Sequence, residues 1–129
     1  MNLRALTCTL ALGATLCLAP PALPHHSNVA FEVEKVITIT GVVKEMRWSN
    51  PHTWLIVTVD ENGKKVDWAC EGRAPGVLLR AGWSRTSLKP GDKVTVDMSP
   101  AKDGSKTSLV ARVTKGDGTI LANAPPNEQ

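Results

Sequence analysis

EKVITITGVVKEMRW, residues 34–48, is the longest β-like stretch of the chain and the one that decides the fold. It is rich in Val, Ile and Thr, residue types that favour β-strands. Its apolar residues alternate with threonine at Ile37 and Ile39. The alternation changes phase across Gly41 and resumes at Val42. Such a change at a glycine predicts a β-bulge, and a long bulged strand can curl a sheet into a barrel.

Four further stretches read as strands, and these are residues 53–60, 65–71, 93–99 and 107–115. Asn62-Gly63 between the first two is the strongest short hairpin signal. Residues 72–82 break the β pattern and predict a short helix, with Pro75 in its first turn and Gly82 at its end. Residues 119–121 predict a short extra strand near the C-terminus.

The order of these elements predicts an all-β fold, a small five-stranded OB-like Greek-key barrel with one short helix between strands 3 and 4. A plain β-sandwich of short strands is the alternative, but it leaves the helix without a role. The alternation in the last three main strands predicts which residues face the core. They are Val66, Trp68, Cys70, Val94, Val96, Met98, Leu109, Ala111 and Val113.

The N-terminus has the pattern of a secretory signal peptide, with a basic start, an apolar segment and a small-residue exit at Ala22. We therefore expect a periplasmic or secreted protein without membrane insertion. The predicted organisation is a signal peptide at 1–22, with cleavage open up to residue 24, an N-terminal arm at 23–33, an OB-like barrel at 34–122 and a disordered tail at 123–129.

Composition restricts the classes of partner. Removal of Arg4 with the leader leaves 14 basic and 12 acidic residues, a net charge of +2 spread along the chain. A nucleic-acid binder normally concentrates basic residues on one face, so we expect no nucleic-acid partner. Cys8 and Cys17 also leave with the leader. Cys70 is then the one remaining cysteine, and its alternation with Trp68 places it in the core rather than at a site.

Histidines supply the most concrete hypothesis for a site. His25 and His26 follow the predicted leader, and His52 lies in the loop that joins the first two strands. Imidazole is the commonest metal ligand and suits copper or zinc. The sequence therefore predicts a metal site at His25, His26 and His52. In the alternative interpretation, the histidine pair is a polar N-terminus and His52 bonds the backbone of its own loop.

The residues around His52 predict a ligand face at the barrel rim. We expect Trp48, Asn50, Trp54 and Glu71 to form it. In the alternative interpretation, the tryptophans close the ends of a small barrel with their indole N–H groups reaching the rim. No nucleophile–base pair stands out, so no catalytic residue is predicted.

Three functions remain open from these residues. The leading one is an exported binding module for an unidentified ligand, with copper or zinc as the most concrete choice. A structural or protein-interaction barrel that binds a periplasmic protein is the second. The third is a copper-dependent redox protein, which requires cleavage directly before His25 so that its α-amine becomes free.

Several motifs together resemble a known family. They are His25-His26-Ser27, Trp48-x-Asn50-Pro51-His52, Trp68-x-Cys70-Glu71-Gly72 and Leu88-Lys89-Pro90-Gly91-Asp92. The chain resembles an uncharacterised family of small exported bacterial proteins, a domain of unknown function with HHS after the signal peptide and a WxNPH motif. The resemblance implies a periplasmic single-domain β-barrel with no assigned activity. Pro24 departs from it, because such leaders commonly end in Ala.

Overall fold

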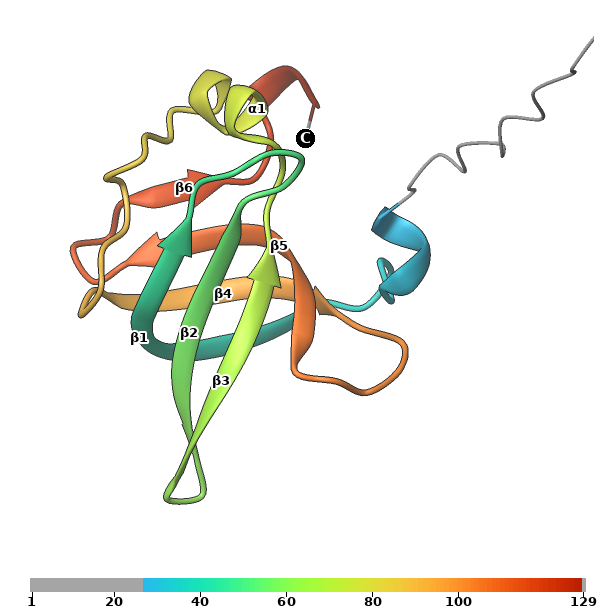
Figure 1. The fold of residues 1–129 in the computed structure, drawn as a ribbon, viewed down its shortest axis with the longest axis vertical. Helices are drawn as coiled ribbons and strands as arrows, with labels where there is room; N and C mark the ends of the chain where they lie inside the picture. The colour runs from blue at the N-terminus through green and yellow to red at the C-terminus, as the bar shows by residue number, and fades with distance from the viewer. Residues whose placement is uncertain (1–26, 129) are drawn as a thin grey trace, which may run out of the picture.

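The computed structural model describes residues 27–128 (Figure 1). The predicted signal peptide, His25 and His26 lie outside the described residues. Six strands are present, and they are β1 (Ile37–Arg47), β2 (Trp54–Glu61), β3 (Lys64–Glu71), β4 (Lys93–Pro100), β5 (Thr107–Lys115) and β6 (Ile120–Ala122). One α-helix and two 3-10 helices accompany them, and these are α1 (Pro75–Arg80), η1 (Ser27–Ala30) and η2 (Pro126–Glu128).

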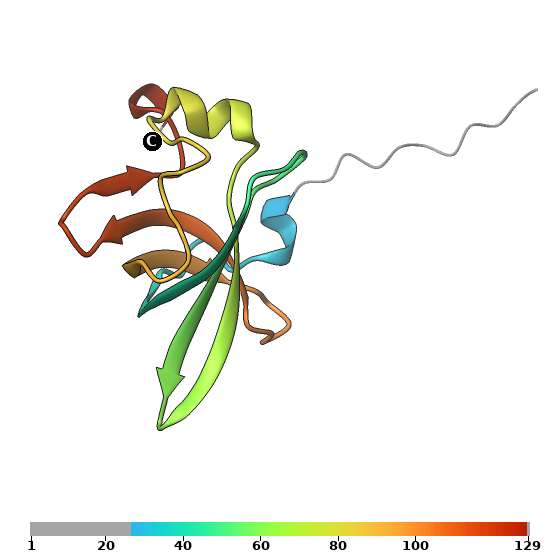
Figure 2. The ribbon, with the colours of Figure 1, turned by 60° about the vertical axis from the view of Figure 1, so that its left-hand side comes forward.

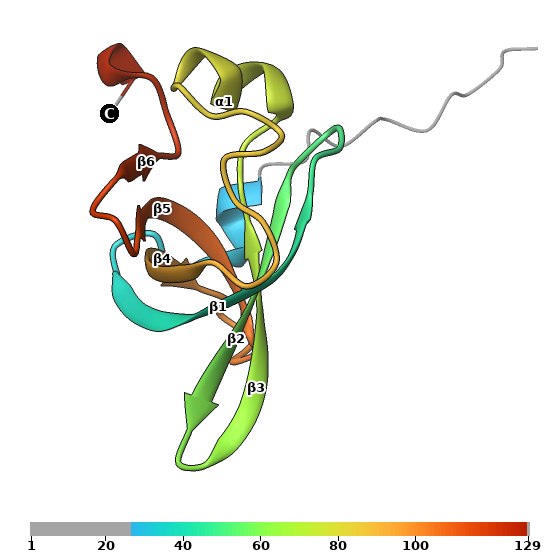
Figure 3. The ribbon, with the colours of Figure 1, turned by 90° about the vertical axis from the view of Figure 1, so that its left-hand side faces the viewer.

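The first five strands close into a barrel. The sheet order is β3-β2-β1-β4-β5-β6, and an additional parallel pairing joins β3 to β5. β1 bends so that its first half pairs with β4 and its second half with β2 (Figures 2 and 3). The OB-like barrel with one short helix between β3 and β4 is therefore confirmed. β6 pairs with the second half of β5 and is not one of the five strands that close the barrel.

The bulge in β1 lies further along the strand than the sequence predicted. The register against β2 shifts between Val43 and Glu45 rather than at Gly41. Val43 is therefore buried, whereas Val42, which we expected inside, is 41% exposed. Gly41 has a different role, because a Cβ atom there would lie 2.4 Å from the carbonyl oxygen of Thr58. The glycine allows β1 to approach β2 closely where β1 changes partner.

The barrel interior is filled mostly by valine and leucine, together with Trp68 and Trp83. The predicted inward faces of β3 and β4 are confirmed. The prediction for β5 was wrong at Leu109 and Ala111, which are not in the core, whereas Val110 and Val113 are. The cause is a register shift against β4 between Asp97 and Met98, which moves the first half of β5 by one residue.

Two of the four tryptophans close the barrel in the way that the alternative interpretation expects. Trp68 and Trp83 are 7% and 4% exposed. The Trp68 indole N–H donates to Glu61 Oε1 at 3.0 Å, and the Trp83 indole N–H donates to the carbonyl of Ala122 at 2.7 Å. Lys106 Nζ lies 4.8 Å from the Trp68 ring centre.

Residues near both ends of the described chain pack against the barrel. Phe31, within the predicted arm, is 4% exposed and bridges to Ala101. Asn123, at the start of the predicted tail, is 8% exposed. Its side chain accepts from the Arg73 N–H at 3.1 Å and donates to the Val110 carbonyl at 2.7 Å, so it joins the end of β3 to β5. Within residues 27–128, no helix has the length and apolar character needed to cross a membrane.

Candidate functional site

The loop between β1 and β2 is anchored to the residues that follow β3. Thr53 donates from its backbone N–H and its Oγ1 to the carbonyl of Arg73, at 3.2 and 3.0 Å. The Gly72 N–H donates back to the Thr53 carbonyl at 2.9 Å. Asn50-Pro51 within the loop is a cis peptide bond. These bonds place the end of the loop, and His52 with it, directly beside the end of β3.

At this junction His52 meets Glu71. The Nδ1 atom of His52 lies 2.5 Å from Oε1 of Glu71. The Glu71 side chain is 9% exposed and the His52 side chain 32% exposed, so Glu71 is the more deeply buried member of the pair. Burial raises the pKa of Glu71 above its ordinary value, and the neighbouring His52 opposes part of that rise.

His52 and Glu71 both line a groove of about 890 Å³ on the outside of the barrel. Its walls come from the segment before β1, the β1–β2 loop, the end of β3 and the residues after it, α1, β4, β5 and the end of β6. The groove is lined by apolar side chains and by a salt bridge in which Arg112 binds Asp97 at 2.5 Å. A hydrogen bond from Thr38 and the bridge to Arg112 lower the pKa of Asp97. The groove is therefore a mixed surface with one ion pair and one imidazole–carboxyl pair.

The structure brings together only part of the predicted ligand face. Trp54 is half-buried and is the cross-strand partner of Glu71. Trp48 is half-buried and packs against the core, and Asn50 is exposed. Of the four predicted residues only Glu71 lines the groove, and Trp48, Asn50 and Trp54 do not.

Within residues 27–128, no group of three or more His, Cys, Asp and Glu side chains is arranged to hold a metal ion. His52 and Glu71 supply two donor groups, so a metal there needs ligands from outside the described residues. Cys70 is not such a ligand, because it is fully buried in the barrel and burial raises the pKa of its thiol to about 11. His25 and His26 are outside the described residues and stay a prediction.

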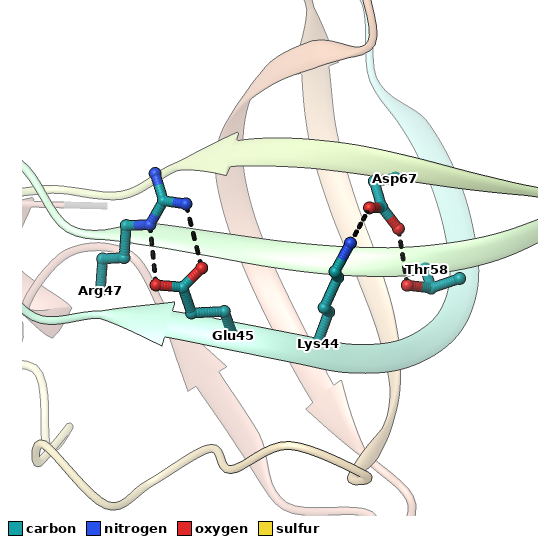
Figure 4. Close-up of polar contacts among 5 residues, drawn as sticks. All are labelled: Lys44, Glu45, Arg47, Thr58 and Asp67. Carbon is teal, nitrogen blue, oxygen red and sulfur yellow. Dashed lines mark hydrogen bonds and ion pairs between the residues drawn. The ribbon is translucent and has the colours of Figure 1, made fainter.

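The outer face of β1, β2 and β3 carries charges that compensate one another (Figure 4). Lys44 binds Asp67, which also accepts a hydrogen bond from Thr58 at 2.7 Å. Arg47 makes two hydrogen bonds to Glu45, at 2.9 and 3.0 Å. The charged side chains drawn on this face are therefore engaged with one another rather than turned outward as a single-sign patch.

Sequence reasoning missed four polar groove residues. Arg73, Asp97, Arg112 and Asn123 come from four separate segments. Closure of β3 on β5 and the register shift between β4 and β5 bring them to one wall. Their spacing in the sequence gives no signal of this, because each reads as an ordinary surface residue.

The fold and this groove define a small closed OB-like barrel with a mixed polar and apolar groove on its outer wall. The chain belongs to a family of unknown function, DUF6152, whose model matches residues 14–111. The match spans β1 to β4 and the first half of β5. It confirms the expectation of an uncharacterised domain. No match was found among curated proteins.

Proposed function

We propose that the protein is an exported periplasmic binding module that holds a copper or zinc ion between His52 and the two histidines of the N-terminal arm. The observation that carries the proposal is the His52–Glu71 pair in the groove. A carboxylate beside the ring is one of the common partners of a metal-binding histidine. Imidazole nitrogens prefer copper and zinc over magnesium and calcium.

The path of the chain supports the participation of His25 and His26. They directly precede Ser27, where η1 begins. The start of η1 lies at the same end of the barrel as the β1–β2 loop (Figures 1 and 2). Val36, at the other end of this segment, lines the same groove as His52. Three imidazoles are enough for a site that leaves a position open for a further ligand.

Thermal melting of the mature protein tests the proposal. A Cu²⁺ or Zn²⁺ concentration about 100 times the dissociation constant should add about 2.7 kcal/mol of stability. For a domain of this size, this corresponds to a rise in Tm of more than about 10 °C. H52A and the double variant H25A/H26A should lose most of this rise, whereas E34Q, which changes an exposed carboxylate, should keep it. An equal rise in H52A, or none in the unmodified protein, would contradict the metal site.

The redox alternative depends on the first residue of the mature chain. If cleavage falls directly before His25, its α-amine and ring can bind one copper ion together. A start at Leu23 excludes this chelate. Intact-mass measurement of the exported protein distinguishes the two starts.

A protein-interaction barrel is the second candidate, and exposed aliphatic residues favour it. Val29, Val33 and Val36 are 67%, 47% and 61% exposed, and Ile120 on the edge strand β6 is 59% exposed. Edge strands and exposed apolar residues are typical of interfaces. Size-exclusion chromatography of the unmodified protein and of V33S/V36S tests this candidate. A larger species that the double substitution dissociates would support it, and a monomer at all concentrations would argue against self-association.

A further inference from the structure

We infer that a second copy of this chain binds along the free edge of β3, residues 64–68, with the two β3 strands antiparallel and a twofold axis beside Val66. β2 and β3 of the two copies then run as one continuous sheet. This interface involves neither the histidines of the proposed metal site nor the exposed valines that precede β1.

The lower half of β3 has a strand neighbour on one side only. β3 pairs with β2 along its whole length, from Lys64 to Glu71. Within residues 27–128, its other edge pairs with β5 only at Ala69–Glu71, so residues 64–68 form a free edge. They belong to a hairpin that extends beyond the rest of the barrel (Figures 1 and 3). A free strand edge is a template for pairing with another chain.

The backbone groups that point to this edge can be identified. The Ala69 N–H donates at 2.9 Å to the carbonyl of Lys106, the residue directly before β5, and so points away from β2. Successive residues of a strand point their N–H and C=O groups to alternate edges. The register of β3 against β2 is unbroken from residue 64 to residue 71. The N–H and C=O groups of Lys65 and Asp67 therefore point to the free edge.

An antiparallel pairing of two β3 strands about Val66 uses these groups. It brings Lys65 of each copy opposite Asp67 of the other. Both residues direct their N–H and C=O groups to the edge, so each symmetry-related pair can exchange hydrogen bonds in both directions. The register that satisfies the free backbone groups is thus also the register that places opposite charges opposite each other.

The side-chain charges select this register over its neighbours. Within one copy, Lys65 binds Asp60 at 2.9 Å, and Asp67 binds Lys44 (Figure 4). Contact of Lys65 with Asp67 of the second copy joins these exposed pairs into a row of alternating sign. An axis moved by one residue places Lys65 opposite Lys65, or Asp67 opposite Asp67. Like charges directly opposite each other destabilise a strand pair, and unlike charges stabilise it.

Sedimentation equilibrium of the chelator-treated mature protein tests whether the dimer forms. Chelation removes any dimer that a metal ion bridges. Small interfaces are weak, so we expect a reversible dimer that appears between about 10 μM and about 1 mM protein. A monomer throughout this range would overturn the inference. A dimer that V33S/V36S dissociates would overturn it as well, because those valines lie outside the β3 edge.

Charge exchange tests the register. K65E and D67K each place two like-charged pairs in the dimer, so each should weaken dimerisation about 10-fold or more. K65E/D67K restores opposite charges and should return the affinity to within a few-fold of the unmodified protein. K93E makes the same charge change at an exposed residue of β4 and should have no effect. Equal dimerisation of K65E, D67K and the unmodified protein would overturn the inference.

Amide hydrogen exchange of the unmodified protein locates the interface without any variant. The Val66 and Trp68 amides point to β2 and should be protected at every concentration. The Lys65 and Asp67 amides should exchange rapidly in dilute protein and several-fold more slowly where the dimer predominates. Concentration-dependent slowing at β6 or before β1, with none at Lys65 and Asp67, would place the contact elsewhere and overturn the inference.

Discussion

Gly41 lies so close to Thr58 that a methyl group on its Cα would stand 2.4 Å from the Thr58 carbonyl oxygen. The same atom would stand 2.8 Å from a methyl group of Val57. The contact occurs where β1 ends its pairing with β4 and begins its pairing with β2, since Val42 pairs with both strands. The bend that closes the barrel therefore depends on a residue without a side chain.

Gly41→Ala should destabilise the protein by about 1–3 kcal/mol, because the added methyl group must push apart two paired strands. Urea unfolding of the chelator-treated protein measures the loss, which corresponds to a drop in Tm of about 4–8 °C per kcal/mol. Gly76→Ala is the matched control. Gly76 lies in α1 with no atom within 4 Å of an added Cβ, so the change should be neutral or stabilise by up to about 1 kcal/mol. Equal effects of the two substitutions would contradict this role for Gly41.

The fold was predictable because its signals are local. Alternation gives each strand its faces, and Asn62-Gly63 marks the hairpin whose two residues have positive φ angles of 56° and 82°. The position of the bulge was not predictable in the same way. Val42 and Val43 are the same residue type, so either could face the core. In the structure Val43 faces the core, and the register against β2 shifts only after it.

The site was predictable in part for the same reason. His52 and Glu71 are linked through one hairpin, and the pairing of Trp54 with Glu71 follows from the register of that hairpin. The Asp97–Arg112 bridge was not predictable, because a register shift between Asp97 and Met98 changes which residues of β4 and β5 face each other. Asn123 was not predictable, because it bonds residues at the end of β3 and in β5, which closure of the barrel brings together. Closure is a long-range event, and no local pattern in the sequence encodes it.

Asn123→Ala should cost about 1–3 kcal/mol, because it leaves the Arg73 N–H and the Val110 carbonyl without their partner. Hydrogen exchange adds a local measurement. The Arg73 amide should exchange faster in the variant, while amides in the centre of β2 should follow only the global loss of stability. Asn127→Ala, at an exposed position, should leave both quantities unchanged. Unaltered exchange at Arg73 in the Asn123 variant would show that the side chain does not protect this junction.

Asp97 should contribute to stability in a pH-dependent way. Its pKa is lowered from the ordinary value of 3.8 by the bond from Thr38 and then by Arg112. The folded protein therefore binds a proton at Asp97 less readily than the unfolded chain. The contribution is fully present above about pH 4 and is lost as the pH falls through the lowered pKa.

Asp97→Asn should accordingly be less stable than the unmodified protein near neutral pH and approach it as the pH falls through the lowered pKa of Asp97. Thr38→Val should also reduce the pH dependence, because it removes the larger cause of the shift. Urea unfolding at a series of pH values measures both curves. A constant difference between Asp97→Asn and the unmodified protein at every pH would show that this carboxylate has the same pKa in the folded and unfolded chain.

Cys70 should be unreactive in the folded protein. Its thiol is fully buried in the barrel, with Sγ 3.7 Å from the sulfur of Met98, and burial raises its pKa to about 11. At pH 8 about one thiol in a thousand would then be ionised, whereas about a quarter of free cysteine is. Exclusion of the reagent from the core lowers the rate further. We therefore expect the mature protein to react with a chromogenic disulfide at least about a hundredfold more slowly in buffer than in denaturing urea. Cys70→Ala should give no signal in either condition, and rapid reaction of the folded protein would mean that the barrel opens readily at β3.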